Sequence, residues 1–327
     1  MNRRDALRAL FAVAASVKPP SSFAQSRPGK SVRVGMLFGS EGMATLFLPS
    51  SETLRELGWV EGKNLTIDRR TADGRPTELP RLASELVQLN PDVIAVPSNF
   101  EAEAVLRATR TIPIVVAAAF DPVETGLAQS LTRPGGSVTG LVWAEAGRSA
   151  KVIEVMHETV PSMRRMASLY DERFPGIQLY LEAGQATADA IGIELRLFPV
   201  RSPEGIAAAL ARMEKERVEG IFVSPGVAIA PEIARILAYA TEHRLPTGFP
   251  NPWPVERGGL MSYAPNISDM LRRIVGLVDK ILRGAKPADL PFEYPRRYEL
   301  TINLKTAKAL GIKLPQAVLL RADRLIE

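Results

Sequence analysis

The sequence predicts an α/β protein of two lobes, each a doubly wound parallel sheet, joined by hinge strands. Asp92–Val96 and Ile114–Ala119 are short continuous apolar runs, as expected of strands buried on both faces. Phe100–Arg110, between them, is rich in helix-forming residues and long enough for a crossover helix. At 327 residues the chain exceeds one comfortable core. A later stretch also echoes the first, since Ile221–Gly226 matches Val93–Ser98 in character.

The first lobe is expected over residues 31–141, as a run of strand–helix repeats. Leu79, Leu82 and Leu86 fall on one helical face, for example, and Pro91 ends that helix. The expected strands are Val32–Phe38, Leu65–Asp68, Asp92–Val96, Ile114–Ala119 and Val138–Val142, and the expected helices include Leu48–Leu57, Phe100–Arg110 and one that starts at Asp121.

The second lobe is expected over residues 144–262 and repeats the plan. Its expected strands are Met166–Tyr170, Glu194–Phe198, Gly220–Ser224 and Pro246–Phe249. An amphipathic helix capped by Asn266 then returns to the first lobe, which gains residues 265–285. Hinge strands are expected near Leu141–Ala144 and Tyr263–Pro265. The C-terminal return segment, residues 286–327, includes a strand at Tyr298–Asn303 and is not assigned to either lobe.

Residues 1–24 have the features of an export signal peptide. Arg3 and Arg4 make a twin-arginine start, Ala9–Val17 is apolar but too short to span a bilayer, and small residues suit cleavage after Ala24. We therefore expect a soluble periplasmic protein, exported by a twin-arginine-like route. The alternative interpretation is a disordered tail with a chance pair of arginines.

The composition argues against several classes of protein. The formal charge is +5, but residues 1–24 carry four basic residues and one acidic residue, and the remaining charge is too balanced for a nucleic-acid binder. There is no cysteine, and His157 and His243 are the only histidines, so material for a metal site or a catalytic triad is scarce. The sequence also lacks the G-x-S-x-G, Walker A and G-x-G-x-x-G motifs. We expect no catalytic residue, metal or cofactor.

The candidate ligand-binding residues lie where predicted strands end, because ligands of such sheets bind at the carboxyl ends of the strands. Ser98 and Asp121 each resemble a helix N-cap, and the free N–H groups of a helix start suit a ligand carboxylate. For Asp121, a cap alone and a contact to a ligand ammonium or hydroxyl both stay open. The aromatic candidates together favour an apolar pocket. The full set is Ser40, Glu41, Ser98, Asn99, Ala119, Phe120, Asp121, Trp143, Tyr170, Asp171, Phe174, Pro225, Gly226, Phe249 and Tyr263.

Several phrases resemble one family over essentially the whole mature chain. They are GWVEGKNLTID, TIPIVV with DPVETGLAQSLTRPGGSVTG, GGLMSY, ILRGAKPADLP and ELTINLKTAKALGIKLP. The chain thereby resembles the ABC-transporter substrate-binding proteins that include tryptophan- and phenylalanine-binding members. The resemblance implies the type I periplasmic binding-protein fold, with three hinge crossings and a ligand enclosed between the lobes. The chain departs from the family at Tyr170–Phe174 and at Ser98–Phe100, where ligand should touch, so the ligand's identity is not carried over.

The leading hypothesis is an exported receptor that closes on a small ligand and delivers it to an ABC permease in the inner membrane. We expect a monomer, with no nucleic-acid partner and with an amino-acid-like or other small carboxylate ligand that has an apolar part. One alternative is a ligand sensor of the same fold that feeds a signalling partner. The other is an α/β enzyme that uses Asp121 and Asp171.

Overall fold

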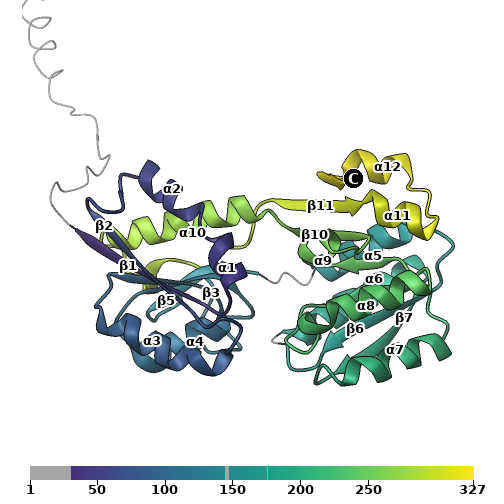
Figure 1. Cartoon of the computed structure of the whole chain (residues 1–327), viewed down its shortest axis with the longest axis horizontal. Helices are drawn as coiled ribbons and strands as arrows, with labels where there is room; N and C mark the ends of the chain where they lie inside the picture. The colour runs from purple at the N-terminus through teal and green to yellow at the C-terminus, as the bar shows by residue number, and fades with distance from the viewer. Residues whose placement is uncertain (1–30, 144–146, 175) are drawn as a thin grey trace, which may run out of the picture. The chain divides into compact units, whose positions relative to one another are not determined.

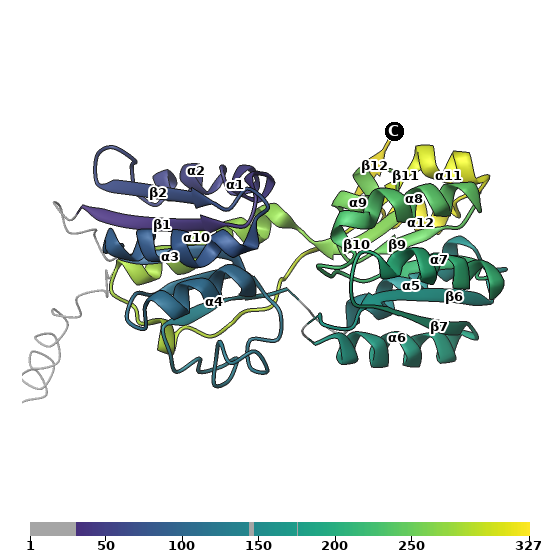
Figure 2. The same cartoon turned by 60° about the horizontal axis from the view of Figure 1, so that its bottom comes forward.

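The computed structural model describes residues 31–143, 147–174 and 176–327 (Figure 1). The predicted export signal, residues 1–24, and Ala144 in the first predicted hinge lie outside the described residues. The described residues form two α/β lobes, each with helices on both faces of one sheet (Figures 1 and 2). We call residues 31–143 and 266–297 lobe 1, and residues 147–265 and 298–327 lobe 2. The predicted fold class is confirmed.

Lobe 1 is built on a five-stranded parallel sheet of order β2-β1-β3-β4-β5. The helices α3 and α4 pack on one face of this sheet, and α2 and α10 pack on the other. The strands are β1 (Val32–Phe38), β2 (Leu65–Thr71), β3 (Val93–Ser98), β4 (Ile114–Ala119) and β5 (Val138–Val142). The helices are α1 (Glu41–Leu46), α2 (Ser50–Glu56), α3 (Leu79–Gln88), α4 (Asn99–Ala108) and α10 (Ile267–Leu282), with 3₁₀ turns η1 (Pro76–Glu78) and η3 (Pro287–Asp289).

Lobe 2 has a seven-stranded sheet of order β12-β11-β10-β9-β8-β6-β7, whose last five strands repeat the order of lobe 1. The sheet is mixed, because β11 runs antiparallel to β10. The strands are β6 (Arg165–Asp171), β7 (Glu194–Val200), β8 (Gly220–Val223), β9 (Thr247–Phe249), β10 (Met261–Pro265), β11 (Tyr298–Asn303) and β12 (Arg324–Ile326). The helices are α5 (Gly147–Thr159), α6 (Ile177–Ile191), α7 (Gly205–Lys215), α8 (Ile233–Glu242), α9 (Trp253–Glu256), α11 (Leu304–Leu310) and α12 (Gln316–Arg321), with the 3₁₀ turn η2 (Ala230–Glu232).

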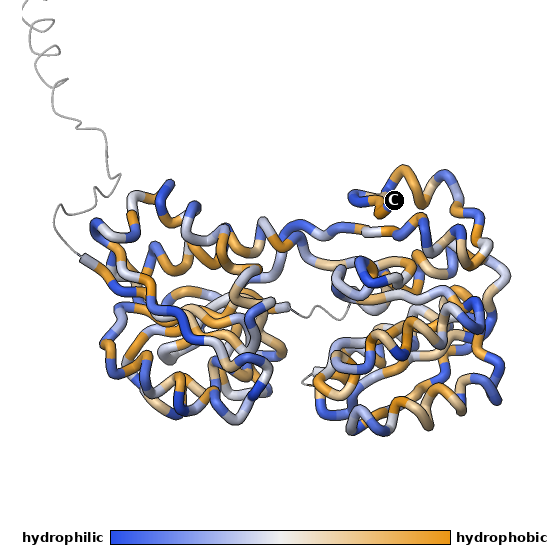
Figure 3. Tube along the Cα trace, in the orientation of Figure 1, coloured by the Kyte–Doolittle hydropathy of each residue, from blue (hydrophilic) through white to orange (hydrophobic). Residues whose placement is uncertain are grey.

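Continuous apolar runs explain why the inner strands are buried on both faces. Five of the six residues of β3 and of β4 are buried, and all five of β5. Figure 3 shows hydrophobic residues along these strands and on the helix faces that pack against them. Burial of each side chain on both faces removes apolar area from water, which is the main favourable term in folding.

The C-terminal segment divides between the lobes. The Thr139 hydroxyl donates to the Leu290 carbonyl at 2.7 Å, and the Phe292 amide donates to the Leu131 carbonyl at 2.8 Å, so residues near 290 belong to lobe 1. The strands β11 and β12 then join the sheet of lobe 2. The chain therefore passes between the lobes after β5, after β10 and before β11.

Two predicted helices differ from the structure. The range Leu48–Leu57 holds only α2, since α1 ends at Leu46 and Pro49, which has no N–H to donate, precedes α2. The helix predicted to start at Asp121 is wrong. The Thr125 amide donates to the Asp121 carbonyl at 3.0 Å and closes one turn, and Gly126 then takes a left-handed φ of 73°. A left-handed residue ends a helix, so the chain continues as turns.

Candidate functional site

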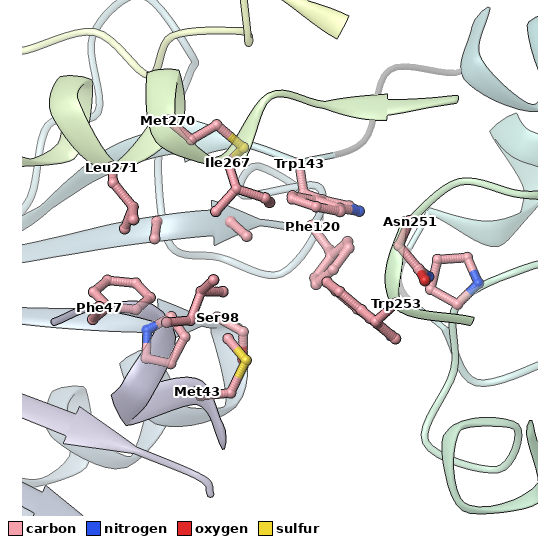
Figure 4. Close-up of a pocket in the computed structure, with 15 residues that line it drawn as sticks. Met43, Phe47, Ser98, Phe120, Trp143, Asn251, Trp253, Ile267, Met270 and Leu271 are labelled. Atoms are coloured by element: carbon pink, nitrogen blue, oxygen red, sulfur yellow. The ribbon is translucent and has the colours of Figure 1, made fainter. Parts of the chain in front are cut away.

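An apolar pocket of about 200 Å³ lies at the carboxyl ends of the strands, and residues of both lobes line it (Figure 4). None of its lining side chains is charged. Lobe 1 contributes Met43, Leu46, Phe47, Pro97, Ser98, Ala117, Ala118, Phe120, Trp143, Ile267, Met270 and Leu271, and lobe 2 contributes Pro225, Asn251 and Trp253. A cavity of about 150 Å³ with apolar walls is known to hold benzene, so this pocket can take a body the size of one aromatic ring.

A bulge in β4 shapes the wall of the pocket. Between the paired residues Val116–Gly140 and Ala119–Val142, β4 holds one more residue than β5, and the consecutive residues Ala117 and Ala118 both line the pocket there. The two strands can approach this closely only because residue 140 is glycine. A Cβ atom on Gly140 would lie 2.0 Å from the Val116 carbonyl oxygen.

Ser98 is the predicted site residue whose local geometry is best defined. It is the N-cap of α4, and its hydroxyl donates to the Glu101 carboxylate at 2.6 Å while accepting from the Phe100 amide at 3.3 Å. Glu101 in turn accepts from the Ser98 amide, which completes a capping box. Burial raises the pKa of Glu101 above its ordinary value, and the hydrogen bonds from Ser98 and from the Gly39 backbone oppose that rise.

The raised pKa makes the stability of the protein depend on pH. The folded state keeps the Glu101 proton at pH values where the unfolded chain has lost it, so this group's contribution declines as pH rises from about 4.5 through the raised folded pKa. We expect Glu101→Gln to remove that decline. Urea unfolding of both proteins across this window measures the difference in slope.

Glu103→Gln is the matched control, since Glu103 is exposed on the same helix. It should keep the wild-type slope. Equal slopes for wild type and Glu101→Gln would contradict the assignment.

Aromatic side chains from both lobes meet at the pocket. The rings of Trp143 and Trp253 stack with centroids 6.3 Å apart, and Phe120 makes an edge contact of 4.7 Å with Phe174. Figure 4 shows Trp143 and Phe120 opposite Trp253 and Asn251. Phe174 does not line the pocket and instead supports Phe120 from behind, in a cluster with Tyr170 and Tyr180.

A larger and more polar cleft of about 780 Å³ adjoins the apolar pocket and shares residues such as Met43 and Trp253 with it. Its wall carries charged groups of lobe 2: Arg324 pairs with Glu256 at 2.6 Å, and Glu299 accepts a hydrogen bond from the Asn266 amide. The predicted residue Ser40 lines this cleft. The arrangement can accept a ligand with an apolar body in the pocket and polar groups in the cleft.

Asp121 lies in a separate cavity with Leu179, Tyr180 and Tyr294. Its φ is 37°, and its carboxylate accepts from the Glu124 amide at 3.1 Å. It does not line the apolar pocket. Of the two interpretations that the sequence left open, this geometry favours the cap.

We therefore expect Asp121→Ala to lower the free energy of unfolding by about 1–2 kcal/mol, through the lost cap and the left-handed backbone, and to leave affinity nearly unchanged. Paired thermal melts and calorimetric titrations measure both quantities. Asp121→Asn keeps the cap and tolerates positive φ but removes the charge, so it should resemble wild type in both assays. A large loss of affinity in the Asn variant would show that the carboxylate holds ligand.

Two predicted polar residues are used within the protein. Asn99 is buried, and its amide nitrogen donates to the Phe120 carbonyl at 2.7 Å while its oxygen accepts from the Phe120 amide at 2.9 Å. Asp171 is buried and accepts from the backbone amides of Ala228 at 2.9 Å and Arg173 at 3.0 Å. These bonds position the loops that carry Phe120 and Pro225.

The other predicted residues lie outside the apolar pocket. Ala119 and Phe249 are core residues, and Gly226 packs against Asp171, where a Cβ atom would lie 2.4 Å from the Asp171 Cβ. Tyr263 stacks on Tyr298 with ring centroids 5.5 Å apart, where β10 pairs with β11. Glu41 is exposed beside Arg69 and Arg70 in a surface groove. Of the predicted set, Ser98, Phe120, Trp143 and Pro225 line the pocket.

Sequence reasoning missed most of the pocket wall. Ile267, Met270 and Leu271 were predicted only as part of an amphipathic helix, and Asn251 and Trp253 were not singled out. A signal for the last two was present. Asn251-Pro252 follows β9 by two residues just as Asp121-Pro122 follows β4, and β9 and β4 hold equivalent places in the two sheets.

The described residues contain no group of three or more His, Asp or Glu side chains placed to hold a metal ion. Within the same part of the chain, no helix has both the length and the apolarity needed to cross a bilayer.

Comparison with known proteins agrees with this architecture. The family model for ABC transporter substrate binding protein matches residues 34–326. A Streptococcus pneumoniae ABC domain solved in complex with L-Trp is 25% identical, with a TM-score of 0.81, over 91% of this chain and 100% of that one. A conserved domain protein from Vibrio cholerae is 28% identical, with a TM-score of 0.80, over 90% and 100% of the two chains.

A curated relative is the tyrosine-binding protein of Clostridioides difficile, 23% identical over 80% of this chain and 75% of that protein. The match over nearly the whole described chain shows the family. The chain belongs to the ABC transporter substrate-binding protein family and is a solute-binding protein rather than an enzyme.

Proposed function

We propose that the chain is the exported receptor of an ABC importer, which captures a small solute and presents it to a permease in the inner membrane. The observation that carries this proposal is the apolar pocket, which is assembled from strand ends and helices of both lobes. Ligands of open α/β sheets bind at that edge. The family supports the transport role.

The ligand that fits best is amino-acid-like, or another small carboxylate with an apolar part. The pocket accepts the apolar body, and the adjoining cleft offers charged groups for the polar end. The first turn of α4, beginning at Ser98, adds a favourable dipole for a carboxylate. Relatives that bind L-Trp and tyrosine are consistent with such a ligand.

Binding is proposed to close the lobes. A ligand that touches Trp143 of lobe 1 and Trp253 of lobe 2 at once favours the arrangement in which both contacts exist. The three passages between the lobes are the places where the backbone can bend. A permease could then distinguish loaded from empty receptor.

The test begins with protein purified from the periplasm without refolding. Its intact mass should begin near Gln25, and native mass spectrometry should identify a co-purified compound. Small-angle scattering should then show a smaller radius of gyration when stripped protein is saturated with that compound. An unchanged profile at saturation would overturn the closure mechanism, and full-length protein confined to the cytoplasm would overturn export.

A further inference from the structure

The side-chain oxygen of Asn251 is a hydrogen-bond acceptor without a partner. Asn251 is only 7% exposed, and its Oδ1 atom is fully buried. Among the described side-chain atoms that are buried and unpaired, it is the one that belongs to a residue of the apolar pocket. Buried polar groups in native proteins are nearly always paired, so an exception needs an explanation.

The position of Asn251 in the fold points to a ligand contact. It lies two residues beyond β9, at the carboxyl edge of the lobe 2 sheet, next to Trp253 in the wall of the pocket (Figure 4). The equivalent residue of lobe 1, Asp121, is satisfied by the turn that it caps. Asn251 has no such bond to its own loop through Oδ1.

The surroundings of Asn251 limit the chemistry of the group it can receive. No carboxylate lines the pocket, and Ser98, the other short polar side chain there, already donates its hydroxyl proton to Glu101. An ammonium desolvated among these side chains would lack a counter-charge, which is unfavourable. A neutral N–H or O–H has no such cost and would satisfy Oδ1.

We propose that Asn251 Oδ1 accepts a hydrogen bond from a neutral donor on the ligand's apolar body, such as a phenol O–H or an indole N–H. Asn251 is then a specificity-determining residue, and the charged end of the ligand lies toward the adjoining cleft. This inference rests on the proposed function, because it assigns the substrate class of the same pocket. A ligand without the donor leaves Oδ1 unpaired and is rejected.

The test uses three probe pairs that differ in the donor and share the charged end: tyrosine and phenylalanine, tryptophan and 1-methyltryptophan, and 3-(4-hydroxyphenyl)propionate and 3-phenylpropionate. Calorimetry on the full mature chain should show the donor-bearing member of at least one pair binding about tenfold to a hundredfold more tightly. Asn251→Leu should bring that ratio near one. Asn251→Asp keeps an acceptor and should retain the preference.

Ligand-free melts add a readout that does not depend on the probe. Asn251→Leu should melt at or above the wild-type temperature, because it removes an unpaired buried acceptor. A lower melting temperature would show that the amide stabilises the protein itself and would overturn the proposal. So would a preference that survives in Asn251→Leu, or a wild type that favours the member without the donor.

Failure of the inference can be told from failure of the proposed function. If none of the six probes binds but the co-purified compound has an apolar body without a neutral donor, the inference is overturned and the receptor role stands. If no probe binds and no compound co-purifies, both are overturned.

Discussion

Replacing Ala118 with phenylalanine will abolish ligand binding while leaving the protein folded. Ala118 is half-buried on β4 and lines the pocket, so a phenyl group there occupies much of its volume of about 200 Å³. We expect affinity to fall by at least about a hundredfold, because the ligand and the new ring compete for one space. Calorimetric titration with the compound identified by mass spectrometry measures the loss.

Ala208→Phe is the matched control, since Ala208 is exposed on α7 in lobe 2. It should bind as wild type does. The melting temperature of Ala118→Phe should stay near that of wild type, because the added ring fills a cavity rather than a packed core. Wild-type affinity in a folded Ala118→Phe protein would show that the ligand binds elsewhere.

The second large effect is expected from Trp253→Ala. Trp253 is 39% exposed, so its truncation should change the free energy of unfolding by less than about 1 kcal/mol. The same ring forms the lobe 2 wall opposite Trp143, and losing it removes apolar contact area from the bound ligand. We expect binding to weaken about tenfold to a hundredfold, in the range of aromatic hot spots. Titration and denaturant unfolding together separate affinity from stability.

Tyr294→Ala provides the comparison, because Tyr294 is 45% exposed and lines the cavity of Asp121 instead. Its loss should not change affinity. If Tyr294→Ala weakens binding and Trp253→Ala does not, the Asp121 cavity is the ligand site and the apolar pocket is not.

Much of the candidate site was beyond prediction because its residues come from distant parts of the chain. The pocket combines α1, the ends of β3 and β4, the first turns of α10 and the loop after β9. Ile267 and Met270 have the spacing of ordinary core residues, and only the packing of α10 on the lobe 1 sheet brings them to the pocket. Spacing alone does not distinguish a helix face that meets a sheet from one that meets a cavity.

Ser98 and Asp121 show the same limit in local motifs. Both have the Ser or Asp, followed three residues later by Glu, that begins a helix, and only Ser98 begins one. Gly126 ends the turn at Asp121, and tertiary packing places that turn beside another cavity. Equal local signals therefore had different outcomes.

The sequence by itself determined the α/β class, the two lobes and the inner strands. The predicted ranges Val32–Phe38, Ile114–Ala119 and Val138–Val142 coincide with β1, β4 and β5, because a strand buried on both faces must be apolar along its length. Only the tertiary structure decided which strand ends face the pocket, that Asn99 and Asp171 are consumed by backbone amides, and that Asn251 is left with an unpaired oxygen. Hydrogen-bond satisfaction depends on which groups meet in space, and residues far apart in the chain supply the partners.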